Sequence, residues 1–190
     1  MKINQENKAK RLYKTNGFTM IELLVVIVIL GILSVIGLGS FRSSQIKARD
    51  SKRKSDIKNI GEALEIYYND FGQYPVADGA GGMMACGVDA QELCVANEIW
   101  HNSTNNTTYM VQLPEDPSGG KYYYKTSPTG NYYQIYAHLE NDQDRDVPTD
   151  ADGAPVNYVN PEVEEGSNAC LIGDCNYGRS STNTDLGLTF

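Results

Sequence analysis

Residues 18–41, FTMIELLVVIVILGILSVIGLGSF, decide the fold of this chain. Glu22 is the one ionisable side chain in this stretch. As an α-helix the stretch would be about 36 Å long, enough to cross a hydrocarbon core of about 30 Å. A cleaved secretory signal would have a shorter apolar core and an Ala-x-Ala-like exit, and this stretch has neither. We therefore expect a transmembrane helix that stays in the mature protein.

Charge is distributed very unevenly along the 190 residues, whose formal net charge is -8. Residues 1–17 carry a net charge of +4, residues 42–58 carry +5 and residues 59–190 carry -16. The chain therefore divides into a basic leader, an apolar segment, a basic segment and an acidic head, which we define as residues 73–190. A sequence pI near 4.7 argues against nucleic-acid binding as the main role of the surface.

The helical pattern continues beyond the apolar segment. Residues 42–72 contain one amphipathic stripe at spacings of three and four, formed by Ile57, Ile60, Leu64, Tyr67 and Phe71. Gly72 suits the first position after a helix, and Pro75 prevents its continuation. We therefore expect a single helix over about 18–71, whose second part packs its apolar stripe on the head.

The head contains three segments rich in Tyr, Val and Ile, at 108–113, 121–126 and 131–139, separated by turn sequences. They predict an antiparallel sheet of about three strands. The flanking residues, 76–107 and 154–190, are loop-like. The predicted fold class is α+β, a long N-terminal helix packed on a small antiparallel sheet, with a loop-rich acidic C-terminal region. Most tyrosines in these strands are expected to pack in the sheet rather than form an outward patch.

All four cysteines lie in the head, as the sequential pairs Cys86 and Cys94, and Cys170 and Cys175. An even number in loop-like sequence favours two local disulfides in an oxidising compartment over four free thiols. Neither pair has the spacing of a CxxC unit, which weakens zinc and redox interpretations. Because Lys and Arg are almost equally numerous on both sides of the apolar segment, they do not fix its orientation. The cysteines place the head outside the cytoplasm.

Glu22 is unusual because an ionised carboxylate in an apolar helix costs several kcal/mol unless it is paired. One interpretation is a tolerated charge at the membrane interface, helped by the helix dipole. The other is a carboxylate that pairs with a cation from another subunit. The residues alone leave both open.

Residues 14–26, KTNG followed by FTMIELLVV, resemble the class III leader junction of type IV pilins and type II secretion pseudopilins. The resemblance implies that a prepilin peptidase removes the leader, residues 1–17, by cutting between Gly17 and Phe18, and then methylates the new amine of Phe18. It also implies that Glu22 guides assembly by pairing with the amine of a neighbouring subunit. The implied partners are further copies of this chain in a helical filament, an inner-membrane assembly platform and its ATPase machinery.

An acidic segment follows the predicted strands and contains Asp142, Asp144, Asp146, Asp150 and Asp152. It does not follow the EF-hand pattern. Major pseudopilins carry calcium in an acidic loop after the sheet, so the resemblance implies a possible structural calcium ion here. The alternative is a solvated acidic loop. The sequence points to no required cofactor.

The basic run at residues 49–54 has three interpretations. It could be a solvated face beside anionic lipid headgroups, or a face that meets the acidic heads of neighbouring subunits. Nucleic-acid binding is the least favoured, because the run lacks interleaved aromatic residues.

Three functions fit these observations, and none is enzymatic, because neither His101 nor His138 accompanies a recognised nucleophile motif. The preferred one is a type IV pilin that begins as a single-pass membrane protein and ends in an extracellular pilus for adhesion, motility or DNA uptake. The second is a pseudopilin of a type II secretion system. The third, from another class, is a membrane-anchored binding or sensor domain that does not polymerise. A disulfide-bearing head favours the exposed fibre of the first.

Overall fold

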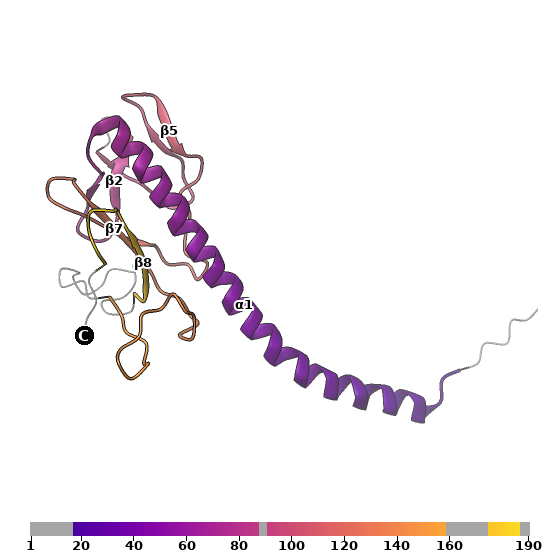
Figure 1. Ribbon diagram of the computed structural model, residues 1–190. Coiled ribbons are helices and arrows are strands. Elements are labelled where there is room, and N and C mark those ends of the chain that lie inside the picture. The colour runs from indigo at the N-terminus through magenta and orange to yellow at the C-terminus, as the bar shows by residue number, and fades with distance from the viewer. Residues whose placement is uncertain (1–16, 88–90, 159–174, 187–190) are drawn as a thin grey trace, which may run out of the picture. The chain divides into compact units, whose positions relative to one another are not determined.

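The computed structural model describes residues 17–87, 91–158 and 175–186, apart from the side chains of 36–40. The chain divides into two compact units, Met1–Ser43 and Ser44–Phe190. Helix α1 (Met20–Phe71) contributes to both, and the strands all belong to the second unit (Figure 1). The helix therefore runs nearly the length that the sequence predicts.

The first unit presents the apolar part of α1. Every large apolar side chain described between residues 18 and 35 is exposed, from 48% for Val25 to 91% for Phe18. Among the described residues, no helix is both long enough and apolar enough to cross a membrane. The transmembrane helix expected over 18–41 includes residues 36–40, whose side chains lie outside the described ones.

The second part of α1 packs as the stripe predicts. Ile57, Ile60, Leu64 and Tyr67 are at most 5% exposed, whereas Phe71, in the last turn, is 37% exposed. The helix stops at Gly72, which takes a left-handed φ of 68° and donates its N–H to the Tyr68 carbonyl at 2.8 Å. A residue with a side chain would be strained in this conformation, which is why glycine suits the helix end.

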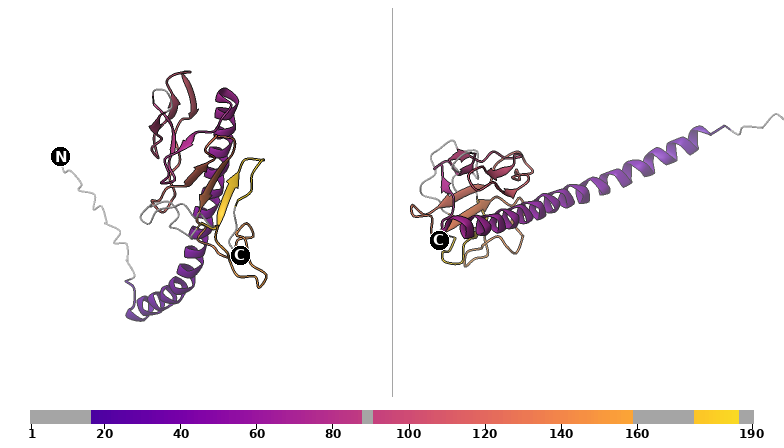
Figure 2. Two further views of the ribbon diagram at one scale, coloured as in Figure 1. Left: turned by 90° about the vertical axis from the view of Figure 1, so that its left-hand side faces the viewer. Right: turned by 90° about the horizontal axis from the view of Figure 1, so that it is seen from above.

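Within the described residues, eight short strands form three antiparallel sheets, so the α+β class is confirmed and the single expected sheet is wrong. The first sheet has the order β1-β2-β3 and lies in the region expected to be loop-like. The second is a hairpin of β4 and β5, and the third has the order β6-β7-β8 (Figure 2). The bounds are β1 (Val76–Ala77), β2 (Met83–Cys86), β3 (Glu92–Leu93), β4 (Trp100–Asn102), β5 (Thr107–Met110), β6 (Tyr123–Thr126), β7 (Tyr133–Ala137) and β8 (Tyr177–Ser180).

The expected meander of 108–113, 121–126 and 131–139 is therefore corrected at its first strand. The backbone of 107–113 already has partners, because β5 pairs with β4 and Leu113 exchanges hydrogen bonds of 2.7 Å with Asn97 and Glu98. The third strand beside β7 is instead β8. Gly178 allows this close pairing, since a Cβ there would lie 2.9 Å from the Ile135 carbonyl oxygen.

The core lies between α1 and the sheets and is mainly aromatic. The Tyr67 ring on α1 lies 5.9 Å from the Trp100 ring and 5.2 Å from the Tyr109 ring, measured between centroids. Tyr123 and Tyr136 pack in a separate apolar cluster with Tyr158, Cys175 and Leu186. Six of the seven strand tyrosines are buried, which confirms ordinary sheet packing: Tyr109, Tyr122, Tyr123, Tyr124, Tyr133 and Tyr136, with Tyr132 half-buried.

Disulfides tie down the loops of the head. Cys86, at the end of β2, is bonded to Cys94, just after β3. Cys175 is also disulfide-bonded, and Cys170, its expected partner, lies outside the described residues. A covalent link between β2 and the residue after β3 stabilises a sheet whose strands are only two to four residues long.

Candidate functional site

The first candidate site is the start of α1, where Thr19 and Glu22 form a capping box. The Thr19 backbone N–H and hydroxyl each donate to Glu22 Oε2 at 2.7 Å, and the Glu22 N–H donates to Thr19 Oγ1 at 3.2 Å. This reciprocal arrangement satisfies the free donors of a helix start, and the helix dipole favours the carboxylate there. The Glu22 carboxylate is therefore held at the end of the helix that Phe18 precedes.

The bond expected to be cleaved lies just outside this helix. Gly17 and Phe18 are exposed and have no regular secondary structure. Because Thr19 keeps its backbone N–H when the bond between Gly17 and Phe18 is cut, the capping box does not depend on the leader. Cleavage at Gly17 and methylation of Phe18 stay predictions.

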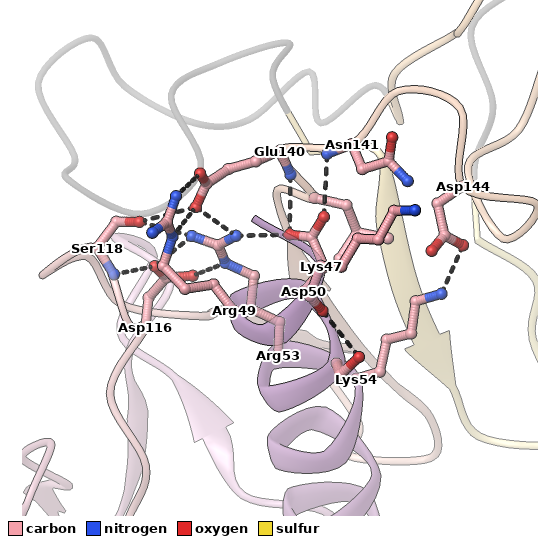
Figure 3. A network of polar contacts seen from close by, with 12 residues as sticks. Lys47, Arg49, Asp50, Arg53, Lys54, Asp116, Ser118, Glu140, Asn141 and Asp144 are labelled. Atoms are coloured by element: carbon pink, nitrogen blue, oxygen red, sulfur yellow. Dashed lines mark hydrogen bonds and ion pairs between the residues drawn. The ribbon is translucent and has the colours of Figure 1, made fainter. Parts of the chain in front are cut away.

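The second candidate site is a group of charges around the buried Arg53 (Figure 3). We call it the Arg53 cluster; it consists of Arg49, Asp50, Arg53, Asp116, Ser118 and Glu140. The Asp50 and Arg53 side chains are each 2% exposed and form an ion pair of 2.7 Å, one turn apart on α1. Arg53 also binds Asp116 through two hydrogen bonds of 2.7 and 2.9 Å, and Glu140 at 2.8 Å. One guanidinium therefore connects the helix to two loops of the head.

The remaining members complete the polar contacts of this cluster. Asp50 accepts backbone N–H groups from Glu140 at 2.9 Å and from Asn141 at 3.0 Å. Arg49 binds both carboxylate oxygens of Glu140, one of them at 2.7 Å. Buried charges are tolerated when they are paired and hydrogen-bonded in this way, and removing one partner leaves the others uncompensated.

The neighbouring charges shift the pKa of several of these groups. The hydrogen bond from Arg49, with those from Arg53, lowers the pKa of Glu140 to about 2. Burial raises the pKa of Asp116, but the Arg53 guanidinium outweighs burial and the net shift is downward. Burial likewise opposes the charged form of Arg53, whose hydrogen bonds with Asp116 and Glu140 raise its pKa overall. These shifts all favour the charged forms, so Glu140, Asp116 and Arg53 are ionised at neutral pH.

This ionisation predicts a loss of stability in acid. A carboxylate whose pKa is lower in the folded chain stabilises folding above its unfolded pKa, and the contribution is lost as pH falls through the folded pKa. For Glu140 that window runs from the ordinary value of 4.5 down to about 2. We expect the melting temperature to fall across this window, and Glu140→Gln to flatten the fall. Thermal unfolding at a series of pH values checks this, with Glu62→Gln at an exposed position as the control.

Sequence reasoning did not find the Arg53 cluster, although the stripe contained the signal. Asp50 and Arg53 lie seven and four residues before Ile57, at positions that continue the apolar stripe. Charged side chains at buried stripe positions require partners from the packed surface. The structure supplies them from the loops after β5 and β7.

Three of the four basic residues in the run are therefore engaged within their own chain, whereas Lys52 is exposed. Arg49 and Arg53 bind the carboxylates of their own chain, and Lys54 Nζ binds Asp144 at 2.5 Å and Asp146 at 2.7 Å. The interpretations as a lipid-facing or neighbour-facing surface are wrong for these three residues. The acidic head provides the countercharges within one chain.

The acidic segment expected to bind calcium is arranged around protein groups. Asp144 and Asp146 bind Lys54, whereas Asp150 Oδ1 accepts the N–H groups of Asp152 at 3.0 Å and Ala154 at 2.8 Å. Across residues 17–87, 91–158 and 175–186, no three His, Cys, Asp or Glu side chains are grouped to hold a metal ion. Calcium takes six to eight oxygens. Calcium binding by the segment that includes Asp142 stays a prediction.

Comparison with known proteins identifies the family. Residues 12–38 match the prokaryotic N-terminal methylation motif, and residues 41–152 match the family described as type II secretion system (T2SS), protein G. The second match covers more than half of the chain and contains the whole Arg53 cluster. The chain belongs to the type II secretion system protein G family. The match to the methylation motif and the protein G match together confirm the pilin and pseudopilin resemblance of residues 14–26.

Similar protein G relatives come from several bacteria. The type II secretion system core protein G of Pseudomonas aeruginosa is 31% identical over 137 residues, which are 72% of this chain and 92% of the relative. The one from Vibrio cholerae is 33% identical over 115 residues, 60% of this chain and 73% of the relative. That of Escherichia coli is 34% identical over 111 residues, which are 57% of this chain and 70% of the relative. No solved structure gives a significant match. These relatives favour the pseudopilin interpretation over the preferred pilin interpretation.

Proposed function

We propose that this chain is a pseudopilin of a type II secretion system, a structural subunit that polymerises into a pseudopilus. Membership of the protein G family carries the proposal. The exposed apolar part of α1 and the matched methylation motif support it, since a subunit that packs its helices in a filament needs an apolar surface at its processed end. The role is structural rather than catalytic.

The proposed cycle begins with a membrane-anchored precursor. Residues 18–41 hold the chain in the membrane, and the disulfide-bonded head lies outside the cytoplasm, where disulfides persist. A prepilin peptidase cuts between Gly17 and Phe18 and methylates the amine of Phe18. An assembly platform with its ATPase then moves the subunit into the pseudopilus.

Glu22 is proposed to select the position of each added subunit. Its carboxylate is fixed by Thr19 at the start of α1, so the amine of a neighbouring Phe18 meets a preformed acceptor. Each of the two charges is costly alone in an apolar environment, and pairing removes much of that cost. The pair therefore specifies axial register more than it adds stability.

The Arg53 cluster has a mechanical role in this proposal. It joins α1 to the loops that carry Asp116 and Glu140 inside the second unit. Bidentate guanidinium–carboxylate contacts fix orientation as well as distance. A head fixed on its helix segment presents the same surface in every subunit, as a regular filament requires.

The deciding experiment is intact-mass analysis and N-terminal sequencing of protein sheared from the filament fraction. We expect a chain that begins with methylated Phe18. A chain that begins at Met1 and is found only in membranes would favour the anchored binding or sensor domain.

Deleting the gene should retain secreted proteins in the periplasm. Loss of abundant surface fibres with normal secretion would restore the type IV pilin interpretation.

Gly17→Ala tests the assigned cleavage site. We expect unprocessed precursor to accumulate, because the peptidase of this family cuts after the glycine of the leader. Immunoblots of membrane fractions report the ratio of precursor to mature chain, and Asn16→Ala serves as the neighbouring control. Normal processing of Gly17→Ala would contradict the assignment.

A further inference from the structure

The loop after β7 binds a cation supplied by another part of the same chain. Lys54, on α1, places its Nζ 2.5 Å from Asp144 Oδ1 and 2.7 Å from Asp146 Oδ2. The same ammonium lies 5.7 Å from the centroid of the Tyr177 ring on β8. Two carboxylates and an aromatic ring are the groups that stabilise an ammonium ion. One side chain therefore connects a helix, a loop and an edge strand of the third sheet.

The loop around this ammonium is folded so that its two carboxylates converge. The Asp146 N–H donates to Asp144 Oδ1 at 3.0 Å, and the Val147 N–H donates to the Asp144 carbonyl at 3.0 Å. Val147 is 3% exposed and anchors the end of the loop in the protein. Two carboxylates this close repel each other unless a cation lies between them. Arg145 also approaches Asp146, at 3.5 Å, but its side chain is 93% exposed, so Lys54 is the partly buried cation that contacts both carboxylates.

The contacts favour an ammonium over a divalent ion. A Lys ammonium donates three hydrogen bonds, two of which these carboxylates accept. Calcium requires six to eight oxygens, and the other acidic side chains of the segment do not converge here, since Asp150 is occupied by the N–H groups of its own turn. Burial opposes the charge of Lys54, but the hydrogen bonds with Asp144 and Asp146 outweigh it and raise the pKa of Lys54.

We propose that Lys54 takes the place of a divalent cation in the acidic loop, so that the loop folds without calcium. The calcium site that the family resemblance implied is replaced in this chain by a side chain from α1. Lys54 is then a positioning residue for residues 141–147. The inference concerns only the loop and holds whether or not the chain polymerises.

Thermal unfolding of the full chain in detergent tests the proposal. We expect the wild-type melting temperature to be the same in a chelator and in calcium at about 1 mM, a concentration that saturates many extracellular calcium modules. Lys54→Met should lower it by several degrees in both solutions. Lys58→Met is the matched control, because Lys58 is a 67% exposed lysine one turn further along α1. If Lys54→Met does not fold, Asp146→Asn removes one of the two ion pairs and should give a smaller decrease.

Two melting-temperature results would contradict the proposal that Lys54 replaces a divalent cation. A wild-type melting temperature that rises by several degrees in calcium would overturn the proposal, because it would show a bound divalent ion. So would a Lys54→Met variant that melts no lower than Lys58→Met. Terbium luminescence excited through tyrosine gives a second readout: the wild-type chain should show no saturable emission, and saturable emission that Asp144→Asn abolishes would place a metal in the loop.

Discussion

Arg53→Met should strongly destabilise the head. The side chain it replaces is 2% exposed and neutralises Asp50, which is equally buried. Removing one partner of a buried ion pair typically costs about 3–5 kcal/mol, because the remaining charge has no solvent and no countercharge. For a chain of this size, such a loss lowers the melting temperature by roughly 10 °C. Circular dichroism of the full chain in detergent measures it.

Two further variants show whether the decrease depends on the buried position of Arg53 and on its planar guanidinium. Lys58→Met removes a lysine with a side chain 67% exposed and should change the melting temperature little. Arg53→Lys keeps the charge but loses the planar fork that binds Asp116 through two hydrogen bonds. We expect its melting temperature to lie between those of the wild type and Arg53→Met. A decrease in Arg53→Met no larger than in Lys58→Met would show that the cluster does not hold the head.

The helix could be predicted from the sequence because its signal is local and long. The stripe from Ile57 to Tyr67 repeats at spacings of three and four, and Gly72 marks its end. Strands β6 and β7 were also predictable, since Tyr-rich runs are bounded there by Pro and Gly turns.

The pairing of strands was predictable only in part. β8 has the sequence Tyr-Gly-Arg-Ser, which lacks alternation and contains a glycine. Its glycine is required by the close approach of β7, a contact between segments about forty residues apart that no local pattern reveals. The short strands β1 to β3 also lack a periodic signal, and glycines lie between them.

The Arg53 cluster shows why charged residues were interpreted wrongly. Read locally, the run at 49–54 is a set of cations beside an apolar segment, and a solvated face is the ordinary expectation. Its countercharges at Asp116 and Glu140 come from loops more than sixty residues away. The register of Asp50 and Arg53 with Ile57 is the local clue, because it predicts burial before it predicts any partner.

Glu22→Ala should abolish assembly of the pseudopilus and leave processing intact. The expected phenotype is mature protein that accumulates in the membrane fraction and is absent from sheared filaments. Loss of the carboxylate removes the acceptor for the amine of the neighbouring Phe18, so an incoming subunit would have to place an unpaired charge in an apolar surrounding. Glu62→Ala, which removes an exposed carboxylate further along α1, should assemble normally and serves as the control.

Thr19 makes this test more specific. Its N–H and hydroxyl hold Glu22 Oε2, so the carboxylate both caps the helix and faces its N-terminal end. Glu22→Gln keeps an oxygen that can accept these hydrogen bonds but removes the negative charge. If the carboxylate acts only as a cap, Glu22→Gln should assemble nearly as well as the wild type. If it neutralises the amine of a neighbour, Glu22→Gln should fail as completely as Glu22→Ala, and abundant filaments from either variant would contradict the pairing.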